Sequence, residues 1–358
     1  MKLLLVALLT VILVSSTVIS HDLFAKSKQQ KTIDKALGKL GWKSICTVGA
    51  TTKSNNQSRI VYDAKCQPTG PPLPPCPAGQ HRDSSNNCVL DVQPPPPIPI
   101  NVIPTLNTSK SIRVGFLSDM DCNSAGTKEL TMFNTYQVQF FVGGGDIGYS
   151  NIKCVLDDRS AHGFNGANSR IARGNHDGSG SEIMTWLGSQ TTWNHKTFAG
   201  GELEVFVVDA NTNMGGQQFT DIKTWLSASQ AIYKIVVVHQ PFVTVASTHP
   251  NNGQFGVYHE LFKQFGVNVI VEGHNHNYQR FLIDKIIYLV TGTGTHDQGN
   301  NLYPTKSNND GQGHTAIKTY QDKNGVTIVD LNIANSTKIT QGWFIGIDNK
   351  VLDSFINK

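Results

Sequence analysis

From Ser111 onward the chain alternates short, continuously apolar runs with stretches whose apolar residues recur at helical spacing. The apolar runs lie at residues 112–117, 138–142, 205–208, 235–238, 267–271 and 286–290. Helical spacing occurs between them, at residues 127–133, 181–187, 217–232 and 258–265. A continuous run of valine and isoleucine is typical of a strand buried on both faces, which implies helices covering a mixed or parallel sheet. The region is therefore predicted to be α/β.

The last part of the chain has a different pattern. Residues 325–357 contain three β-rich runs and no helical spacing, which predicts antiparallel strands that close a second sheet. The expected fold is α/β, with two mixed β-sheets packed as a sandwich and flanked by helices. The expected domain covers residues 109–358, and a small region and a linker precede it.

The first residues predict export. Met1 and Lys2 precede an apolar run, Leu3–Val14, and small polar residues follow it. This order is typical of a secretory signal, which we place at residues 1–20. A buried helix and an uncleaved anchor are the alternatives. The run is short for a membrane span, and no other stretch approaches one. We therefore expect a secreted or cell-surface protein.

Two further regions follow the expected signal. Residues 21–70 form a small region in which residues 31–45 have the pattern of one amphipathic helix. Residues 71–108 are rich in proline, which favours an extended, semi-rigid linker. A ligand for a proline-binding groove is the alternative for this linker, and the sequence names no partner for it.

The cysteine count and the net charge narrow the class of protein. Six cysteines in an exported chain favour disulfides, and their spacing suggests sequential pairs: Cys46 with Cys66, Cys76 with Cys88, and Cys122 with Cys154. The net charge of +4 mildly favours an anionic ligand. No basic stripe is interleaved with aromatic residues, so there is no nucleic-acid-binding signature.

Side chains able to bind a metal occupy successive loops of the predicted domain, several of them directly after an apolar run. They are Asp119 and Asp121, Asp146 and Tyr149, Asn175 with His176 and Asp177, then His239, and finally His274 and His276. Ligand sites of open α/β sheets lie beyond the carboxyl ends of the strands, so we expect these side chains to converge on one rim. A helix cap, a turn or a buried core histidine would explain any one of them alone.

The chemistry of these side chains indicates the kind of ion. Carboxylate, phenol, amide and imidazole groups without cysteine suit borderline or hard first-row ions. The candidates are too numerous for one tetrahedral ion and suit a pair of ions.

At this point the sequence resembles a known family. Residues from about 112 to 358 resemble the calcineurin-like metallophosphoesterases and, within them, the purple acid phosphatase branch. The blocks that carry the resemblance stand in order: Asp119, Gly145-Asp146-Ile-Gly-Tyr149, Gly174-Asn175-His176-Asp177, His239 and Gly273-His274-Asn275-His276. The wider superfamily has a histidine ligand in the first block. The purple branch instead uses a tyrosine three residues after the bridging aspartate, where this chain has Tyr149.

The resemblance implies a division of the ligands between two ions. It assigns three residues to the first ion and three to the second, with Asp146 bridging both: Asp119, Tyr149 and His276, and Asn175, His239 and His274. The ions expected are Fe(III) with Fe(II), Zn or Mn. The activity implied is hydrolysis of the phosphate monoester of a small substrate by a metal-bound hydroxide, outside the cytoplasm. A phosphodiesterase or nucleotide hydrolase is the enzymatic alternative, and a non-catalytic exported binding protein is the other.

The resemblance also implies supporting roles. His176 and His249 are the candidates to donate a proton to the leaving group or to hold a phosphoryl oxygen, with an exposed loop residue as the alternative for His249. Asp121 stands where the purple branch has glycine, so it either binds the first ion or orients water. Asp177 and Arg280 are candidates to support the ligands from behind, and for Arg280 we favour a structural ion pair over contact with substrate.

Overall fold

The computed structural model describes residues 103–296, 305, 308–334 and 338–358, together with four short strands, β1 (Ser44–Ile45), β2 (Gln67–Pro68), β3 (Gln80–Arg82) and β4 (Cys88–Leu90). The chain divides into two compact units, residues 1–93 and 94–358. In the first unit β1 pairs with β2 and β3 with β4, both antiparallel. The helix predicted over residues 31–45 is therefore wrong at its C-terminal end, because Ser44 and Ile45 form strand β1, which pairs with β2. The expected signal and most of the linker lie outside the described residues.

The second unit contains a six-stranded sheet with the order β17-β16-β15-β5-β6-β7. Strands β5 (Ser111–Leu117), β6 (Phe140–Gly143) and β7 (Ser169–Ile171) are parallel. The C-terminal strands β15 (Gly325–Asn332), β16 (Thr340–Gly346) and β17 (Val351–Asn357) are antiparallel, as predicted. Because β15 pairs with β5, they complete the sheet that β5 begins.

The other sheet has seven strands in the order β14-β12-β13-β11-β10-β9-β8. Its centre is parallel and consists of β9 (Leu203–Val207), β10 (Tyr233–Val238), β11 (Val269–Glu272) and β13 (Ile286–Thr291). Antiparallel strands lie at its edges: β8 (Asn194–Phe198), β12 (Tyr278–Ile283) and β14 (Lys318–Tyr320). All residues of the four central parallel strands are buried, which explains why their sequences are mostly apolar.

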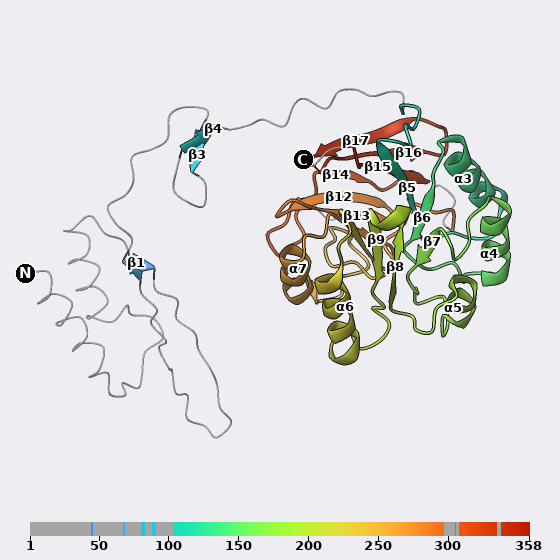
Figure 1. Ribbon diagram of the computed structural model, residues 1–358, viewed down its shortest axis with the longest axis horizontal. Helices are drawn as coiled ribbons and strands as arrows, with labels where there is room; N and C mark the ends of the chain where they lie inside the picture. Colours follow the sequence, from blue (N-terminus) through green and yellow to red (C-terminus); the bar gives the residue numbers. More distant parts are fainter. Residues whose placement is uncertain are drawn as a thin grey trace, which may run out of the picture. The chain divides into compact units, whose positions relative to one another are not determined.

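Helices cover the outer faces of both sheets (Figure 1). On the six-stranded sheet they are α3 (Ser124–Thr135), α4 (Ile152–Ala161) and α5 (Ser181–Leu187), and on the seven-stranded sheet α6 (Gly216–Ala228) and α7 (Phe255–Gln264). The inner faces of the sheets pack on each other, for example Val114 and Phe116 of β5 with Val205 and Val237. The predicted sandwich of two mixed sheets flanked by helices is confirmed. Within the part of the chain that the structure describes, no helix has the length and apolar character that a bilayer crossing requires.

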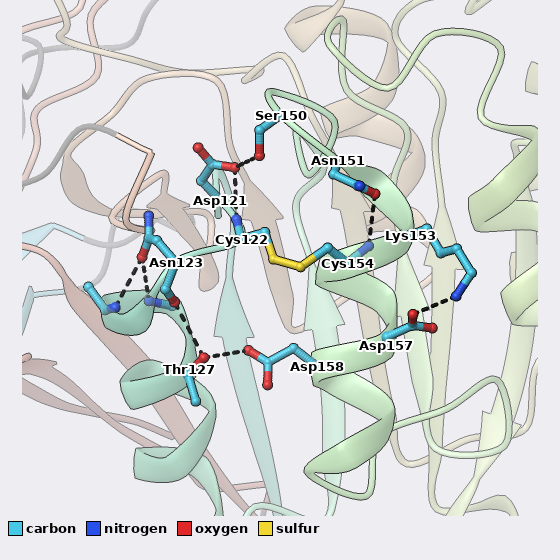
Figure 2. The surroundings of a disulfide bond; sticks show 12 residues. Asp121, Cys122, Asn123, Thr127, Ser150, Asn151, Lys153, Cys154, Asp157 and Asp158 are labelled. Atoms are coloured by element: carbon cyan, nitrogen blue, oxygen red, sulfur yellow. Dashed lines mark hydrogen bonds and ion pairs between the residues drawn. A yellow bond between two sulfur atoms is a disulfide. The ribbon is translucent and has the colours of Figure 1, made fainter.

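A disulfide fastens the six-stranded side of the domain. Cys122, just before α3, is bonded to Cys154 in the first turn of α4, and their Cα atoms are 5.9 Å apart. Figure 2 shows the bond between two helix starts whose side-chain caps, Asn123 and Asn151, bind nearby backbone N–H groups. The predicted pairing of Cys122 with Cys154 is thus confirmed, and the side chains of the other four cysteines lie outside the described part of the chain.

We expect removal of this bond to destabilise the domain. The two cysteines are 32 residues apart, and loop entropy predicts a loss of about 3 to 4 kcal/mol when both become serine. Chemical denaturation of the Cys122→Ser, Cys154→Ser double variant measures the loss. The matched control is Lys153→Ala, which removes an ion pair to Asp157 between side chains that are 77% and 65% exposed; it should change stability by less than about 0.5 kcal/mol. Equal stability of the double variant and wild type would contradict the expectation.

Candidate metal centre

The carboxyl ends of both sheets meet at one place. Ser118, directly after β5, donates its backbone N–H to the Thr291 carbonyl of β13 at 3.1 Å, and the two hydroxyls are 3.0 Å apart. The Ser118 carbonyl in turn accepts the N–H of Gly294 at 3.0 Å. These bonds join the six-stranded sheet to the seven-stranded sheet. Loops after β5, β6 and β7 therefore lie beside loops after β10 and β11, and together they carry the predicted ligands.

One group of predicted ligands surrounds the Tyr149 hydroxyl. Its oxygen is 3.1 Å from Asp119 Oδ1, 3.0 Å from Asp146 Oδ2 and 2.8 Å from His276 Nε2. His276 Nε2 is also 3.2 Å from Asp119 Oδ1. The structure thus brings together Asp119, Tyr149 and His276, the set predicted for the first ion, with the carboxylate of Asp146 beside them.

A second group lies on the other side of Asp146. His239 Nε2 is 3.2 Å from Asp146 Oδ2 and 3.1 Å from Asn175 Oδ1. Potential ligand atoms of Asp146, His239 and His274 all lie within 4.8 Å of one another. Asp146 Oδ2 is therefore close to both groups, which is the position that a bridging carboxylate needs. The His239 ring is fixed from behind, since its Nδ1 lies 2.7 Å from the Gly144 carbonyl.

The backbone at three of these residues is strained. Asp119, Asp146 and His274 have φ angles of 59°, 51° and 67°, in the left-handed region that residues with a side chain rarely adopt. Hydrogen bonds to Asp177 hold the Asp146 turn: its carboxylate accepts the N–H groups of Asp146, Ile147 and Gly174 at 2.9, 2.7 and 2.7 Å. The Asp119 carboxylate accepts the His274 N–H at 3.0 Å. Strain that the surroundings maintain is typical of functional sites.

Charges in the centre are strongly coupled. Burial alone would raise the pKa of Asp146, but the neighbouring His239 imidazole lowers it to about 2. Burial opposes protonation of His239, yet Asp146 raises its pKa to about 9. Burial and the nearby His239 lower the pKa of His274 to about 4. Burial, together with the carboxylates of Asp119 and Asp146, raises the pKa of Tyr149.

These shifts show how the residues present would fit metal ions. A neutral imidazole at His274 offers a lone pair to a metal at neutral pH. A phenolate at Tyr149 requires added positive charge, because two carboxylates already oppose it. The donor set of carboxylates, phenol, amide and imidazoles, supplied from both sheets, therefore fits a pair of cations that would compensate the buried negative charge.

The remaining predicted residues lie around this set. The His176 backbone N–H donates to Asp146 Oδ1 at 2.7 Å. The centroid of the His176 ring is 4.5 Å from that of the Tyr149 ring. The His249 ring is 4.3 Å from the His274 ring. Arg280 forms a two-pronged ion pair with Asp353 of β17, at 2.7 and 3.1 Å, which is another link between the sheets.

Asp121 contacts residues beside the two ligand groups and not the predicted ligands themselves. Its Oδ1 accepts hydrogen bonds from the Ser150 hydroxyl and, at 2.7 Å, from the Cys122 N–H (Figure 2). Its Oδ2 is 3.8 Å from His296 Nδ1. The carboxylate thus lies beside the disulfide, between the loop after β5 and the residue that follows Tyr149.

His296 belongs to the centre and was missed from the sequence. Its ring stacks flat on that of Tyr149, with centroids 3.3 Å apart and planes 6° apart, and it meets the His276 ring edge-on at 5.6 Å. His296 follows β13 in a Gly-Thr-Gly-Thr-His loop. The rule that ligand sites lie beyond strand ends would have found it, had it been applied to this strand as well.

Comparisons with known proteins agree with the fold. Residues 112–278 match the family model of the calcineurin-like phosphoesterases. No curated protein matches the chain in sequence. The match and the fold together support the predicted superfamily resemblance.

Solved structures with a similar fold include two from different organisms. One is GAP50, the anchor in the inner membrane complex of Plasmodium, with a TM-score of 0.53, 15% identity and coverage of 70% of this chain and 89% of that chain. The other is the purple acid phosphatase PPD1 from yellow lupin seeds, with a TM-score of 0.52, 16% identity and coverage of 69% of this chain and 53% of the lupin chain. This chain has a metallophosphoesterase-like fold.

Gly174 offers a test of whether the geometry of the centre matters for metal binding. A Cβ at this position would lie 2.0 Å from Asp146 Oδ1 and 2.3 Å from Asp146 N, so alanine must displace the carboxylate between the two groups. We expect Gly174→Ala to lose most of the bound metal, measured by elemental mass spectrometry after equilibration with iron and zinc. Gly256→Ala is the control, because a Cβ there meets nothing within 4 Å. Full metal content in Gly174→Ala would show that the Asp146 position is not required.

Proposed function

We propose that the protein hydrolyses phosphate monoesters of small molecules with a pair of metal ions, outside the cytoplasm. The observation that carries this proposal is the position of Asp146, whose Oδ2 lies within 3.2 Å of both Tyr149 Oη and His239 Nε2. One carboxylate between two separate groups of ligands is the arrangement that a two-ion phosphoesterase uses. The superfamily match over residues 112–278 supports the same reaction class.

Each group of side chains has a place in the proposed reaction. When bound, two ions would supply an activated water and charge stabilisation for the attacking and leaving oxygens of an in-line displacement. Asp119, Tyr149 and His276 would hold one ion, and Asn175, His239 and His274 the other. Asp177 would keep the Asp146 turn in place through its three backbone hydrogen bonds.

Two histidines flank the ligands and would act on the substrate. His176 lies beside Tyr149 and is exposed, and His249 lies beside His274. An imidazole at either position can donate a proton to the departing alkoxide or bind a phosphoryl oxygen. His296 would orient Tyr149, because its ring stacks on the phenol. Asp121 would orient His296 and nearby water, because its carboxylate lies 3.8 Å from His296 Nδ1.

The proposed metals follow from the donor set. Asp119, Asp146 and Tyr149 together supply enough negative charge for a trivalent ion, so we propose Fe(III) on the tyrosine side. Fe(II), Zn or Mn would occupy the side with Asn175 and two imidazoles. The proposed location outside the cytoplasm rests on the N-terminal signal-like sequence and fits the disulfide.

A second candidate function comes from another class. The fold is shared with GAP50, whose structure is described as that of an anchor, and this favours a non-catalytic binding protein as the alternative. A phosphodiesterase or nucleotide hydrolase on the same residues is the enzymatic alternative. Turnover and metal content separate these candidates.

We expect the purified protein, loaded with iron and zinc or manganese, to hydrolyse p-nitrophenyl phosphate faster than bis(p-nitrophenyl) phosphate. His276→Ala should lower kcat/KM by at least about 100-fold, because it removes one of the side chains proposed to hold the ion on the tyrosine side. His162→Ala is the control, since His162 caps the C-terminus of α4 and contacts Thr131 and Asp158. Absence of turnover with every metal would favour the binding protein, and faster turnover of the diester would favour the phosphodiesterase.

The proposed ion at Tyr149 can be seen directly. An Fe(III)-bound phenolate absorbs visible light, so the iron-loaded protein should be coloured and Tyr149→Phe colourless at equal folded content. Removal of metal by a chelator should abolish the colour of the wild-type protein, and iron should restore it. A colourless, fully active wild-type protein whose activity is unchanged by Tyr149→Phe would refute an iron–tyrosinate.

A further inference from the structure

A cleft of about 440 Å³ opens beside the centre on the side of the seven-stranded sheet. His274 forms part of its wall, so the cleft begins at a proposed metal ligand. Its other walls come from the loop between β9 and α6, from Gln240 after β10, and from residues 250–254 before α7. The cleft therefore lies where the alcohol of a bound phosphate ester would extend, if its phosphate lay on the ligand groups.

Carboxamide side chains dominate the lining. They are Asn213, Gln240, Asn251, Asn252 and Gln254. Met214 and Pro250 add apolar surface. Among the described residues that line the cleft, none is Asp, Glu, Lys or Arg. This neutral surface differs from the adjoining centre, where carboxylates and imidazoles converge.

Local hydrogen bonds hold several of the amides in place. Asn213 Oδ1 accepts the Gly215 N–H at 2.9 Å, and Asn251 Oδ1 accepts the Gly253 N–H at 3.0 Å. With these oxygens occupied, each amide keeps its NH₂ group as the available donor. Gln240 is held by its NH₂ group, which donates to Asn211 Oδ1 at 2.7 Å, and its Oε1 has no hydrogen-bond partner among the described residues. Because that oxygen is buried, the cleft presents mainly amide N–H donors to a ligand.

From this cleft we infer the substrate class of the proposed hydrolase: its leaving group is a neutral, hydroxyl-bearing ring such as a sugar. An anionic alcohol would lose water here without a lysine or arginine to replace it, and a cationic alcohol would find no carboxylate. A purely apolar alcohol would leave the amides without partners. Hydroxyl oxygens of such a ring can accept hydrogen bonds from the amide NH₂ groups, while exposed Pro250 can contact the face of the ring. The inference rests on the proposed function.

The reaction would deliver the alcohol into this cleft. Water supplies the oxygen of the new bond to phosphorus, the bond from phosphorus to the sugar oxygen breaks, and a proton from a flanking histidine or from water neutralises the departing alkoxide. The products are inorganic phosphate and a neutral alcohol. A free sugar and the ribose of a nucleoside share this hydroxyl chemistry, and the volume of the cleft lies within the usual range for small-molecule pockets.

The first experiment compares leaving groups on the metal-loaded, full-length protein. We expect kcat/KM for glucose 6-phosphate or adenosine 5′-monophosphate to exceed that for 3-phosphoglycerate and phosphoethanolamine by about 10-fold or more. Preference between the first two substrates distinguishes a sugar from a nucleoside. A preference for the anionic or the cationic alcohol would overturn the inference.

Charge substitutions in the cleft provide the matched test. Asn213→Asp and Asn251→Asp keep the shape of the side chain, remove a donor and add a negative charge. Each should lower the ratio of kcat/KM for glucose 6-phosphate to that for phosphoethanolamine by about 10-fold, an effect that simple damage to the fold would not produce. Asn134→Asp, at an exposed position of α3, is the control and should leave the ratio unchanged. An unchanged ratio in both cleft variants would overturn the inference.

A binding measurement separates this inference from the proposed hydrolysis. Saturation-transfer NMR should show contact of the protein with glucose or adenosine and not with gluconate or glucosamine, and Asn251→Asp should reduce the signal. Binding of a neutral ring without turnover of p-nitrophenyl phosphate would support the inferred specificity of the cleft and contradict the proposed hydrolysis. If neither glucose nor adenosine binds, the inferred preference of the cleft for a neutral ring is wrong, even if the enzyme is active.

Discussion

The junction between the two sheets is the constraint on which the rest of the site depends. Ser118 bonds to Thr291 through backbone and side chain, and its carbonyl accepts the Gly294 N–H. The Asp119 carboxylate then accepts the His274 N–H, so a residue from each sheet is held at the same point. Asp119, Asp146 and Asn175 follow strands of one sheet, while His239, His274 and His276 follow strands of the other. The contacts of His276 with Asp119 and of His239 with Asp146 cross between the sheets, so they depend on this junction.

Much of this arrangement could be predicted from the sequence, because buried parallel strands and their exits have a local signature. The six predicted apolar runs overlap β5, β6, β9, β10, β11 and β13. Edge strand β8 was missed because Asn-His-Lys-Thr-Phe alternates polar side chains on its accessible face. Helix α4 was missed because its sequence, Ile-Lys-Cys-Val-Leu-Asp-Asp-Arg-Ser-Ala, has a narrow apolar face. We expected the ligands at one rim, and they indeed meet, but two sheets supply them. Which strands pair is a long-range property that no local pattern carries.

The tyrosine side of the centre depends on a small polar network beyond the predicted ligands. The disulfide holds Cys122, next to Asp121, against the start of α4, which closely follows Tyr149 and Ser150. Asp121 in turn bonds to Ser150 and lies near His296, whose ring covers the phenol. A covalent bond, a carboxylate and a stacked imidazole thus restrict one aromatic ring from several directions. Such restriction matters for a phenol that must remain in place while its two carboxylate neighbours oppose its ionisation.

The two sheets contribute different chemistry to the proposed enzyme. Loops of the six-stranded sheet supply all the carboxylates in the ligand set, Asp119 and Asp146, together with the supporting Asp177 and Asp121. Loops of the seven-stranded sheet supply the predicted imidazole ligands and the neutral, amide-lined cleft beside His274. Charge for holding cations and contacts for recognising an alcohol are therefore carried by separate loops. On the proposed function, substitutions in residues 212–214 or 250–254 would alter the leaving group that fits without moving a carboxylate, whereas a change at Asp177 or Gly174 would displace Asp146 and so affect the proposed reaction itself.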